Sequence, residues 1–174
     1  QGSIFDIIND NWLCMIAFPP CTHLAVSGAA WFEQKRKDGR QQEGINFFLQ
    51  IANSNIKHTA IENPVGIMSK HYKRPSQIIQ PYYFGDKAQK TTCLWLKNLP
   101  LLYHNDKINL FDKKVTHVQP EGNIMFGNKM YSWTNNKWFK SKEERSRERS
   151  KTFPGIAEAM ATQWGNYLIE KYKL

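Results

Sequence analysis

Two features that would place this 174-residue chain in common classes are missing from it. There is no apolar run of about 18 residues, which excludes a membrane-spanning helix. The first eight residues combine neither a basic start nor an apolar core, so no signal peptide is expected. A cytoplasmic protein without membrane contact is therefore predicted.

Cysteine and histidine are scarce, and their spacing excludes two further classes. The three cysteines, Cys14, Cys21 and Cys93, are odd in number and lack framework spacing, which predicts free thiols in a reducing compartment. Five scattered histidines form no metal-ligand pattern, so no metal site is expected. Cys14 and Cys93 lie inside apolar, strand-like runs and are predicted to pack in the interior.

Positive charge and aromatic residues are abundant. Lys and Arg number 24 against 15 Asp and Glu, which gives a net charge of +9. Such an excess favours an anionic partner, with nucleic acid the first candidate. A hydrophobic fraction of 41% in a chain of this length predicts one domain, over residues 1–174, with a substantial core.

The apolar run Leu13–Phe18 has strand length and no alternation, which is typical of a strand buried on both faces of a parallel sheet. Pro19 and Pro20 end it, because proline donates no ladder hydrogen bond. Cys21 then lies just past the carboxyl end of the strand. Thr22 is predicted to cap a helix over about 23–32, and 33–42 is predicted to be a polar loop.

A second buried strand is predicted at His58–Glu62, after an amphipathic helix over Glu43–Ala52. A strand–helix–strand order of this kind makes the two strands parallel. The carboxyl ends of parallel strands meet at one edge of the sheet, where ligands collect in open α/β sheets. We therefore expect Cys21 and Glu62 to emerge at the same edge.

The second half of the chain has a different pattern. Thr91–Leu96 predicts a further strand. Short β-prone segments between Gly-containing turns predict an antiparallel excursion over 115–139. An apolar stripe and Pro154 predict a closing helix over Phe153–Leu174. The fold class expected is α/β, with this small antiparallel excursion.

The segment Phe18-Pro19-Pro20-Cys21-Thr22, followed some forty residues later by Glu62-Asn63-Pro64, resembles the nucleophile loop and the Glu-Asn strand end of DNA cytosine-5 methyltransferases. The chain is similar in particular to a compact phage and bacterial group of that family. The similar segments are Met15–Thr22, Ile61–Gly66, Pro75–Gly85, Lys90–Leu99 and Arg149–Gly165. The resemblance implies a single methyltransferase-like catalytic domain with a Rossmann-like sheet, in the cytoplasm of a bacterial or phage-infected cell.

The resemblance also implies residue roles. Cys21, as a thiolate, would attack C6 of a flipped cytosine, and Glu62 would engage the ring N3 and the exocyclic amine. C5 would then take a methyl group from S-adenosylmethionine. Pro20 and Asn63 would lie beside the target base, and Lys87 and Lys90 would contact the DNA.

The chain departs from the family pattern at the cofactor site. None of its ten glycines forms a Gly-x-Gly pair, whereas the family has a Phe-x-Gly-x-Gly-like turn. Gly2-Ser3-Ile4 stands where the family has Gly-Asp-Ile. Ser3, Ile4 and Pro19 remain as weak candidates for cofactor contacts. The sheet is therefore expected to be truncated at its amino end, with S-adenosylmethionine binding completed by the full protein.

Other functions share parts of the pattern. A catalytically inactive DNA-binding remnant of the family has the same charge and strands. An amino-methyltransferase uses a Pro-Pro loop, although Phe18-Pro19-Pro20-Cys21 lacks its polar and aromatic ends. A zinc deaminase needs a cysteine at position 24, which is leucine, and a His-x-Glu that is absent. A thymidylate-synthase-like enzyme uses Pro-Cys-His, where this chain reads Pro20-Cys21-Thr22-His23, and nothing else in the chain supports that function.

Overall fold

The computed structural model describes residues 2–104, 116–120, 124–126, 129–131, 141, 143–144, 147 and 150–174. Contacts between residues divide the chain into two compact units. The sheet unit comprises Gln1–Ile79 and Thr92–Leu101, and the C-terminal unit comprises Gln80–Thr91 and Leu102–Leu174. A single domain over the whole chain stays a prediction.

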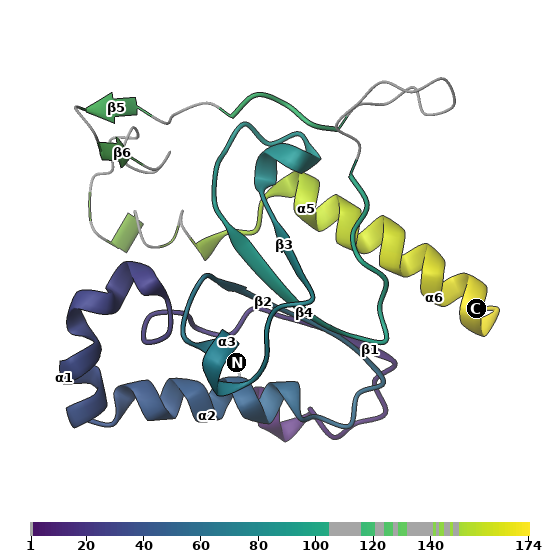
Figure 1. Ribbon diagram of the computed structural model, residues 1–174. Helices are drawn as coiled ribbons and strands as arrows, with labels where there is room; N and C mark the ends of the chain where they lie inside the picture. Colours follow the sequence, from purple (N-terminus) through teal and green to yellow (C-terminus); the bar gives the residue numbers. More distant parts are fainter. Residues whose placement is uncertain are drawn as a thin grey trace. The chain divides into compact units, whose positions relative to one another are not determined.

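The sheet unit has a mixed four-stranded sheet, which makes the fold α/β (Figure 1). Its strands are β1 (Cys14–Ala17), β2 (His58–Pro64), β3 (Gln77–Ile79) and β4 (Thr92–Lys97). The order across the sheet is β1-β2-β4-β3. β1 pairs with β2 in parallel, and β4 runs antiparallel to both β2 and β3. The strands predicted at 13–18, 58–62 and 91–96 are all confirmed, with small shifts of their ends.

Burial of the first strand on both faces was predicted, and this is wrong. Among the described strands β1 lies at the edge of the sheet, and Ile16 keeps 39% of its surface exposed. Phe18, just beyond the strand, is 48% exposed. An uninterrupted apolar run is consistent with an edge strand as well as a central one, because periodicity does not report how many neighbours a strand has.

The connection from β1 to β2 differs from the prediction in its first half. Residues 22–24 form a turn, followed by the 3-10 helix η2 (Val26–Trp31) and by α1 (Phe32–Lys37). The helix predicted over 23–32 is present only as a 3-10 helix over 26–31, without the predicted Thr22 cap, and the loop predicted over 33–42 is wrong. Gly39, with φ of 83°, separates α1 from α2. This left-handed backbone favours glycine, which has no Cβ to clash.

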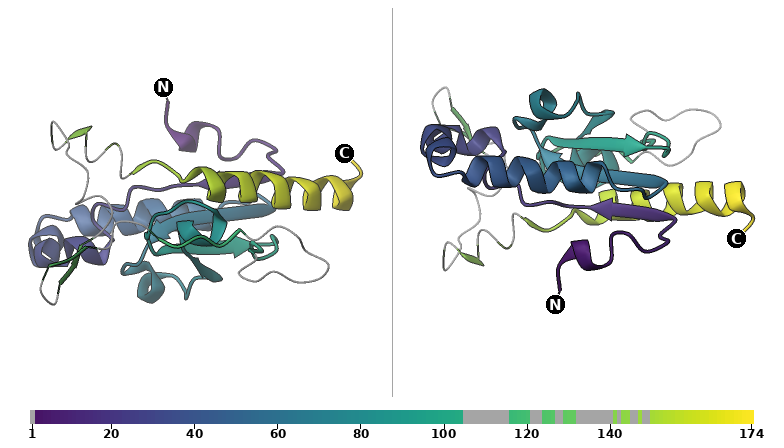
Figure 2. Two further views of the ribbon diagram at one scale, coloured as in Figure 1. Left: turned by 90° about the horizontal axis from the view of Figure 1, so that it is seen from above. Right: turned by 90° about the horizontal axis from the view of Figure 1, so that it is seen from below.

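Helix α2 (Arg40–Ala52) confirms the predicted amphipathic helix and begins three residues earlier. Its buried side chains Ile45, Phe48 and Ile51 belong to one apolar cluster with Ile61 of β2 and Trp95 of β4. The ring centroids of Phe48 and Trp95 are 5.2 Å apart in an edge-on arrangement. Each such buried side chain contributes about 2 kcal/mol relative to exposure. α1 and α2 lie along one side of the sheet (Figure 2).

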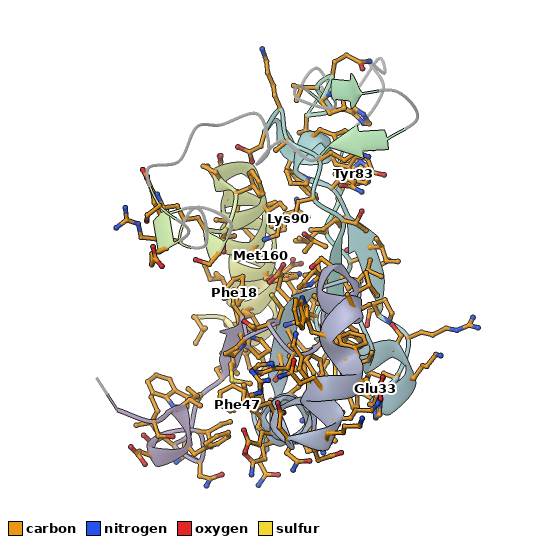
Figure 3. The ribbon with its side chains drawn as sticks, turned by 90° about the vertical axis from the view of Figure 1, so that its left-hand side faces the viewer. Phe18, Glu33, Phe47, Tyr83, Lys90 and Met160 are labelled. Carbon is orange, nitrogen blue, oxygen red and sulfur yellow. The ribbon has the colours of Figure 1, made fainter. Side chains whose placement is uncertain are left out.

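The amino-terminal segment also packs on α2. It forms the 3-10 helix η1 (Ile4–Asp6). The rings of Phe5 and Phe47 meet edge-on with centroids 5.3 Å apart, and Figure 3 shows Phe47 on α2. A short helix, α3 (Met68–His71), follows β2 and buries Met68 in the same apolar cluster.

The C-terminal unit contains the predicted closing helix. It runs through α5 (Pro154–Ala159), a π-helical turn η5 (Met160–Trp164) and α6 (Gly165–Tyr172). Pro154 occupies its first turn, as predicted. Ile156, Met160 and Trp164 are buried. The 3-10 helix η3 (Pro81–Phe84) packs against α5.

The antiparallel excursion is confirmed in one part. β5 (Ile124–Phe126) pairs antiparallel with β6 (Lys129–Tyr131). Residues 116–118, predicted as a strand, form none, although the Val118 amide donates to the Tyr82 carbonyl at 2.9 Å. Residues 105–115 and 132–139 lie outside the described residues.

Gly155 fixes the start of the closing helix, and its replacement by alanine is expected to destabilise the protein. The Gly155 amide donates to Asp86 Oδ2 at 2.8 Å, and an added Cβ would overlap the Phe84 carbonyl oxygen. We expect Gly155→Ala to lower the free energy of unfolding by about 2 kcal/mol, as overpacking does. Urea denaturation measures this change.

Gly165 provides the matched control in the same helix. No atom lies within 4 Å of the position its Cβ would take. Gly165→Ala is therefore expected to be neutral, or to stabilise by up to about 1 kcal/mol through helix propensity. Equal stability of the two variants would contradict the close approach at Gly155.

Candidate active site

The candidate site lies at the carboxyl ends of β1 and β2. These strands are parallel, with Ala17 in register with Ile61. Glu62 follows Ile61 within β2, and Cys21 follows the end of β1 by four residues. The parallel pairing brings the two chain segments to the same edge of the sheet.

Asn63 joins the two strand ends directly. Its Nδ2 donates to the Pro19 carbonyl at 2.8 Å, and both residues are buried. Only 1% of Asn63 is exposed, and its Oδ1 has no hydrogen-bond partner among the described residues. The amide therefore anchors the Pro19-Pro20 turn on β2. The contact with DNA predicted for Asn63 stays a prediction.

The turn that carries Cys21 is held through its backbone carbonyls. The Cys21 carbonyl accepts from the amides of Leu24 and Ala25, at 3.0 and 2.9 Å. Further along, the Thr22 carbonyl accepts from Lys35 Nζ at 2.7 Å. These three hydrogen bonds to two neighbouring carbonyls leave the turn little freedom, so the position of the Cys21 backbone is well defined.

A side chain of α2 also binds the turn. Gln41 Nε2 donates to the His23 carbonyl at 3.3 Å. Lys35 and Gln41 are 7% and 4% exposed, which is unusual for these residue types. The burial of these two residues was not predicted from the sequence. The break at Gly39 separates the short helix that carries Lys35 from the helix that carries Gln41, so no single helical pattern includes both.

The chain that follows β2 also binds the Cys21 turn. The Ile67 amide donates to the Leu24 carbonyl at 3.0 Å, and the Val26 amide donates to the Val65 carbonyl at 3.0 Å. Between these bonds Ala25 and Gly66 form an isolated antiparallel bridge. The segments after the two strands are thus bonded to each other as well as to the sheet.

The three thiols differ in their surroundings. Burial raises the pKa of Cys14, and burial together with the negative charge of Glu62 raises the pKa of Cys93. Both groups are therefore held as neutral thiols, in keeping with the packing role predicted for them. Cys21 is half-buried, unlike the fully buried Cys93. Glu62 is in register with Leu94 of β4, the residue that follows Cys93.

Pro20 and two predicted lysines complete the substrate side of the prediction. Pro20 is exposed directly before Cys21. Lys87 and Lys90 belong to the C-terminal unit, in the polar segment before β4. Lys87 is exposed, and Lys90 Nζ lies 6.0 Å from the centroid of the Phe153 ring (Figure 3). Their joint action with Cys21 on DNA rests on the sequence.

The three residues predicted to contact the cofactor each make contacts within the fold, and their contact with S-adenosylmethionine stays a prediction. Ser3 and Asp6 form a capping box, in which Ser3 Oγ accepts from the Phe5 amide at 3.2 Å. Ile4 packs against the apolar cluster. Pro19 is buried and its carbonyl is bonded to Asn63. The polar groups offered at these positions are already used within the fold.

The described part of the chain shows neither a metal-binding group of side chains nor a helix that could span a membrane. No group of three or more His, Cys, Asp or Glu side chains could hold a metal ion there. No helix described there has both the length and the apolar character needed to cross a bilayer.

Comparison with known proteins adds no assignment. No family model matches the chain, and no curated protein matches it significantly. The function is therefore argued from the geometry of the site and from its chemistry.

Proposed function

We propose that this protein acts on DNA as a cytosine-5 methyltransferase-like protein of the compact phage and bacterial group, with Cys21 as the nucleophile. One observation carries the proposal. The Cys21 turn is anchored by Asn63 to the end of the parallel strand that also carries Glu62. A thiol and a carboxyl at adjacent strand ends suit attack on a ring carbon together with hydrogen bonding to a ring nitrogen.

The residues of the chain account for the addition step. The Cys21 thiolate forms a bond from Sγ to C6 of cytosine. The electron pair of the C5–C6 double bond moves through the ring toward N3, which is protonated by way of the Glu62 carboxyl, with solvent as the source of the proton. The reverse movement expels the thiolate and restores the ring. In the complete reaction S-adenosylmethionine supplies the methyl group for C5.

Charge and strand arrangement support the DNA partner and the fold. The net charge of +9 suits a polyanion. The base has to leave the duplex before Cys21 reaches C6. A parallel β1–β2 pair with an open β1 edge is consistent with one half of a Rossmann-like methyltransferase sheet. We place the protein in the cytoplasm, where free thiols are stable.

The addition step is tested without a methyl donor. Once Sγ is bonded to C6, C5 becomes basic and exchanges its hydrogen with solvent. We expect cytosine in duplex DNA to gain deuterium at C5 when incubated with the protein in heavy water, as measured by mass spectrometry of the released nucleosides. Absence of exchange, together with absence of methyl transfer to C5 when S-adenosylmethionine is added, contradicts the proposal.

A DNA-binding remnant without catalysis is the second candidate. It is favoured by the missing Gly-x-Gly turn and by the engaged polar groups of Ser3 and Pro19. This candidate predicts salt-dependent DNA affinity without C5 exchange. An amino-methyltransferase would transfer a methyl group to an exocyclic nitrogen, also without C5 exchange. The measurement of C5 exchange therefore distinguishes it from a cytosine-5 methyltransferase.

The DNA partner has its own measurement. If about four lysines and arginines neutralise phosphates, log Kobs falls with log salt at a slope of about −3.6. Fluorescence anisotropy with labelled duplex DNA measures this slope over about 50 to 200 mM salt. An affinity that is independent of salt would remove the electrostatic argument for DNA.

A further inference from the structure

Lys35 is buried behind the Cys21 turn without a carboxylate partner. It is 7% exposed, and its Nζ donates to the Thr22 carbonyl at 2.7 Å. The Phe32 ring centroid lies 5.8 Å from the same Nζ. No carboxylate forms an ion pair with it in the described part of the chain. A buried ammonium costs free energy unless it is compensated, so a turn that retains one requires an explanation.

The backbone around Lys35 leaves space for the ammonium and little else. Gly28 of η2 faces it, and an added Cβ there would lie 3.1 Å from Lys35 Nζ and 3.6 Å from the Thr22 carbonyl oxygen. The ammonium is thus enclosed between η2, α1 and the turn. Thr22 directly follows Cys21, so the ammonium is bonded to the backbone of the residue next to the proposed nucleophile.

A purely mechanical role is already provided by neighbouring contacts. Gln41 holds the His23 carbonyl and Asn63 holds the Pro19 carbonyl, both with neutral amides. A third neutral donor would serve the Thr22 carbonyl at a lower desolvation cost than an ammonium. The charge of Lys35 therefore distinguishes it from the other two contacts.

We propose that Lys35 is a positioning residue for Cys21, which fixes the Thr22 carbonyl and makes the turn electropositive, so that anionic groups are favoured beside the thiol. This inference rests on the proposed role of Cys21 as a nucleophile toward DNA. The anionic group favoured there is a phosphate of the DNA backbone next to the target nucleotide.

The experiment compares two alkylating reagents on Cys21 in the whole chain, without DNA or methyl donor. Iodoacetate is an anion and iodoacetamide is neutral, and in both the thiolate displaces iodide to form a carbon–sulfur bond. Peptide mass spectrometry gives the rate at Cys21 separately from Cys14 and Cys93. The ratio of the two rates reports local charge, because a change in turn structure or thiol access acts on both reagents.

We expect Lys35→Met to lower the iodoacetate-to-iodoacetamide ratio at Cys21 by about threefold to fivefold, from one unit charge several ångströms away. Lys37→Met is the matched control. It removes the same charge from the same helix, but Lys37 is 76% exposed and pairs with Glu33, which is itself 73% exposed on the surface of α1. Its ratio is expected to remain that of the unsubstituted protein.

Two further variants separate charge from structure. Gln41→Leu removes a neutral contact and is expected to change both rates together, which leaves the ratio constant. Lys35→Gln keeps a donor for the Thr22 carbonyl and is expected to lower the ratio as Lys35→Met does, so it provides the measurement if the methionine variant does not fold.

Equal ratios in the Lys35 and Lys37 variants overturn the inference. Because no DNA or methyl donor is present, that result leaves the proposed function standing, and a failure of C5 exchange leaves the charge at the turn standing.

Discussion

Replacement of Cys21 by serine is expected to lower cytosine C5 exchange on the order of 10³-fold or more, the loss typical of a missing nucleophile. Attack on C6 needs an anionic or strongly nucleophilic atom. A thiol ionises near neutral pH, particularly beside a positive charge, whereas a serine hydroxyl needs an adjacent general base. Deuterium incorporation at C5, normalised to DNA bound, measures the loss.

Cys14→Ala is the matched control for this prediction. Cys14 is the first residue of β1, the strand that leads to Cys21, and burial raises its pKa, which keeps it as a neutral thiol. We expect Cys14→Ala to retain exchange within about twofold, since surface and packing changes of this size act mainly on stability. Exchange that survives Cys21→Ser at the unsubstituted rate would remove Cys21 from the mechanism. Loss of exchange in both variants would point to a structural effect on β1.

The strands that carry the site were predictable from the sequence. Apolar runs at 13–18 and 58–62 gave β1 and β2, and the helical segment between them gave their parallel pairing. Prolines at 19 and 20 gave the turn that ends β1. These features are local, because they depend on backbone donors and on side-chain patterns within a few residues.

The contacts that hold the Cys21 turn were not predictable in the same way. Lys35 and Gln41 lie in a polar segment that reads as solvated, and both are buried only because α1 and α2 fold back on the turn. Thr22 has the chemistry of a helix cap, but the Cys21 carbonyl accepts two amides first and starts a turn instead. Tertiary contacts outweighed local propensity at these positions.

The edge position of β1 also lay beyond the sequence. The six residues Leu13–Phe18 are uncharged, as in a central strand, yet Ile16 and Phe18 keep between a third and a half of their surface exposed. Strand order depends on which other segments pair, which is a property of the whole sheet. An uncharged edge of this kind is a natural place for a further strand to pair.

Replacement of Gly66 by alanine is expected to lower the free energy of unfolding by about 3 kcal/mol. An added Cβ would overlap the Leu24 carbonyl oxygen and would lie 3.0 Å from the Leu24 carbonyl carbon. Both are backbone atoms, so no side-chain rotation relieves the overlap. The Ala25–Gly66 bridge and the hydrogen bond from the Ile67 amide to the Leu24 carbonyl would have to separate. Urea denaturation measures the loss.

Gly44→Ala tests whether the effect comes from the backbone contact. An added Cβ at Gly44 would approach the same residue, Leu24, but at the side-chain atom Cδ2, 3.3 Å away. A leucine side chain adjusts by a few tenths of an ångström, and alanine favours the interior of α2. We therefore expect Gly44→Ala to change stability by less than about 1 kcal/mol. A similar loss in both variants would show that crowding at the Leu24 side chain, and not the Leu24 carbonyl, limits this position.

Because Leu24 closes the turn that begins at the Cys21 carbonyl, Gly66→Ala is also expected to alter alkylation of Cys21 by iodoacetamide, while Gly44→Ala leaves it unchanged.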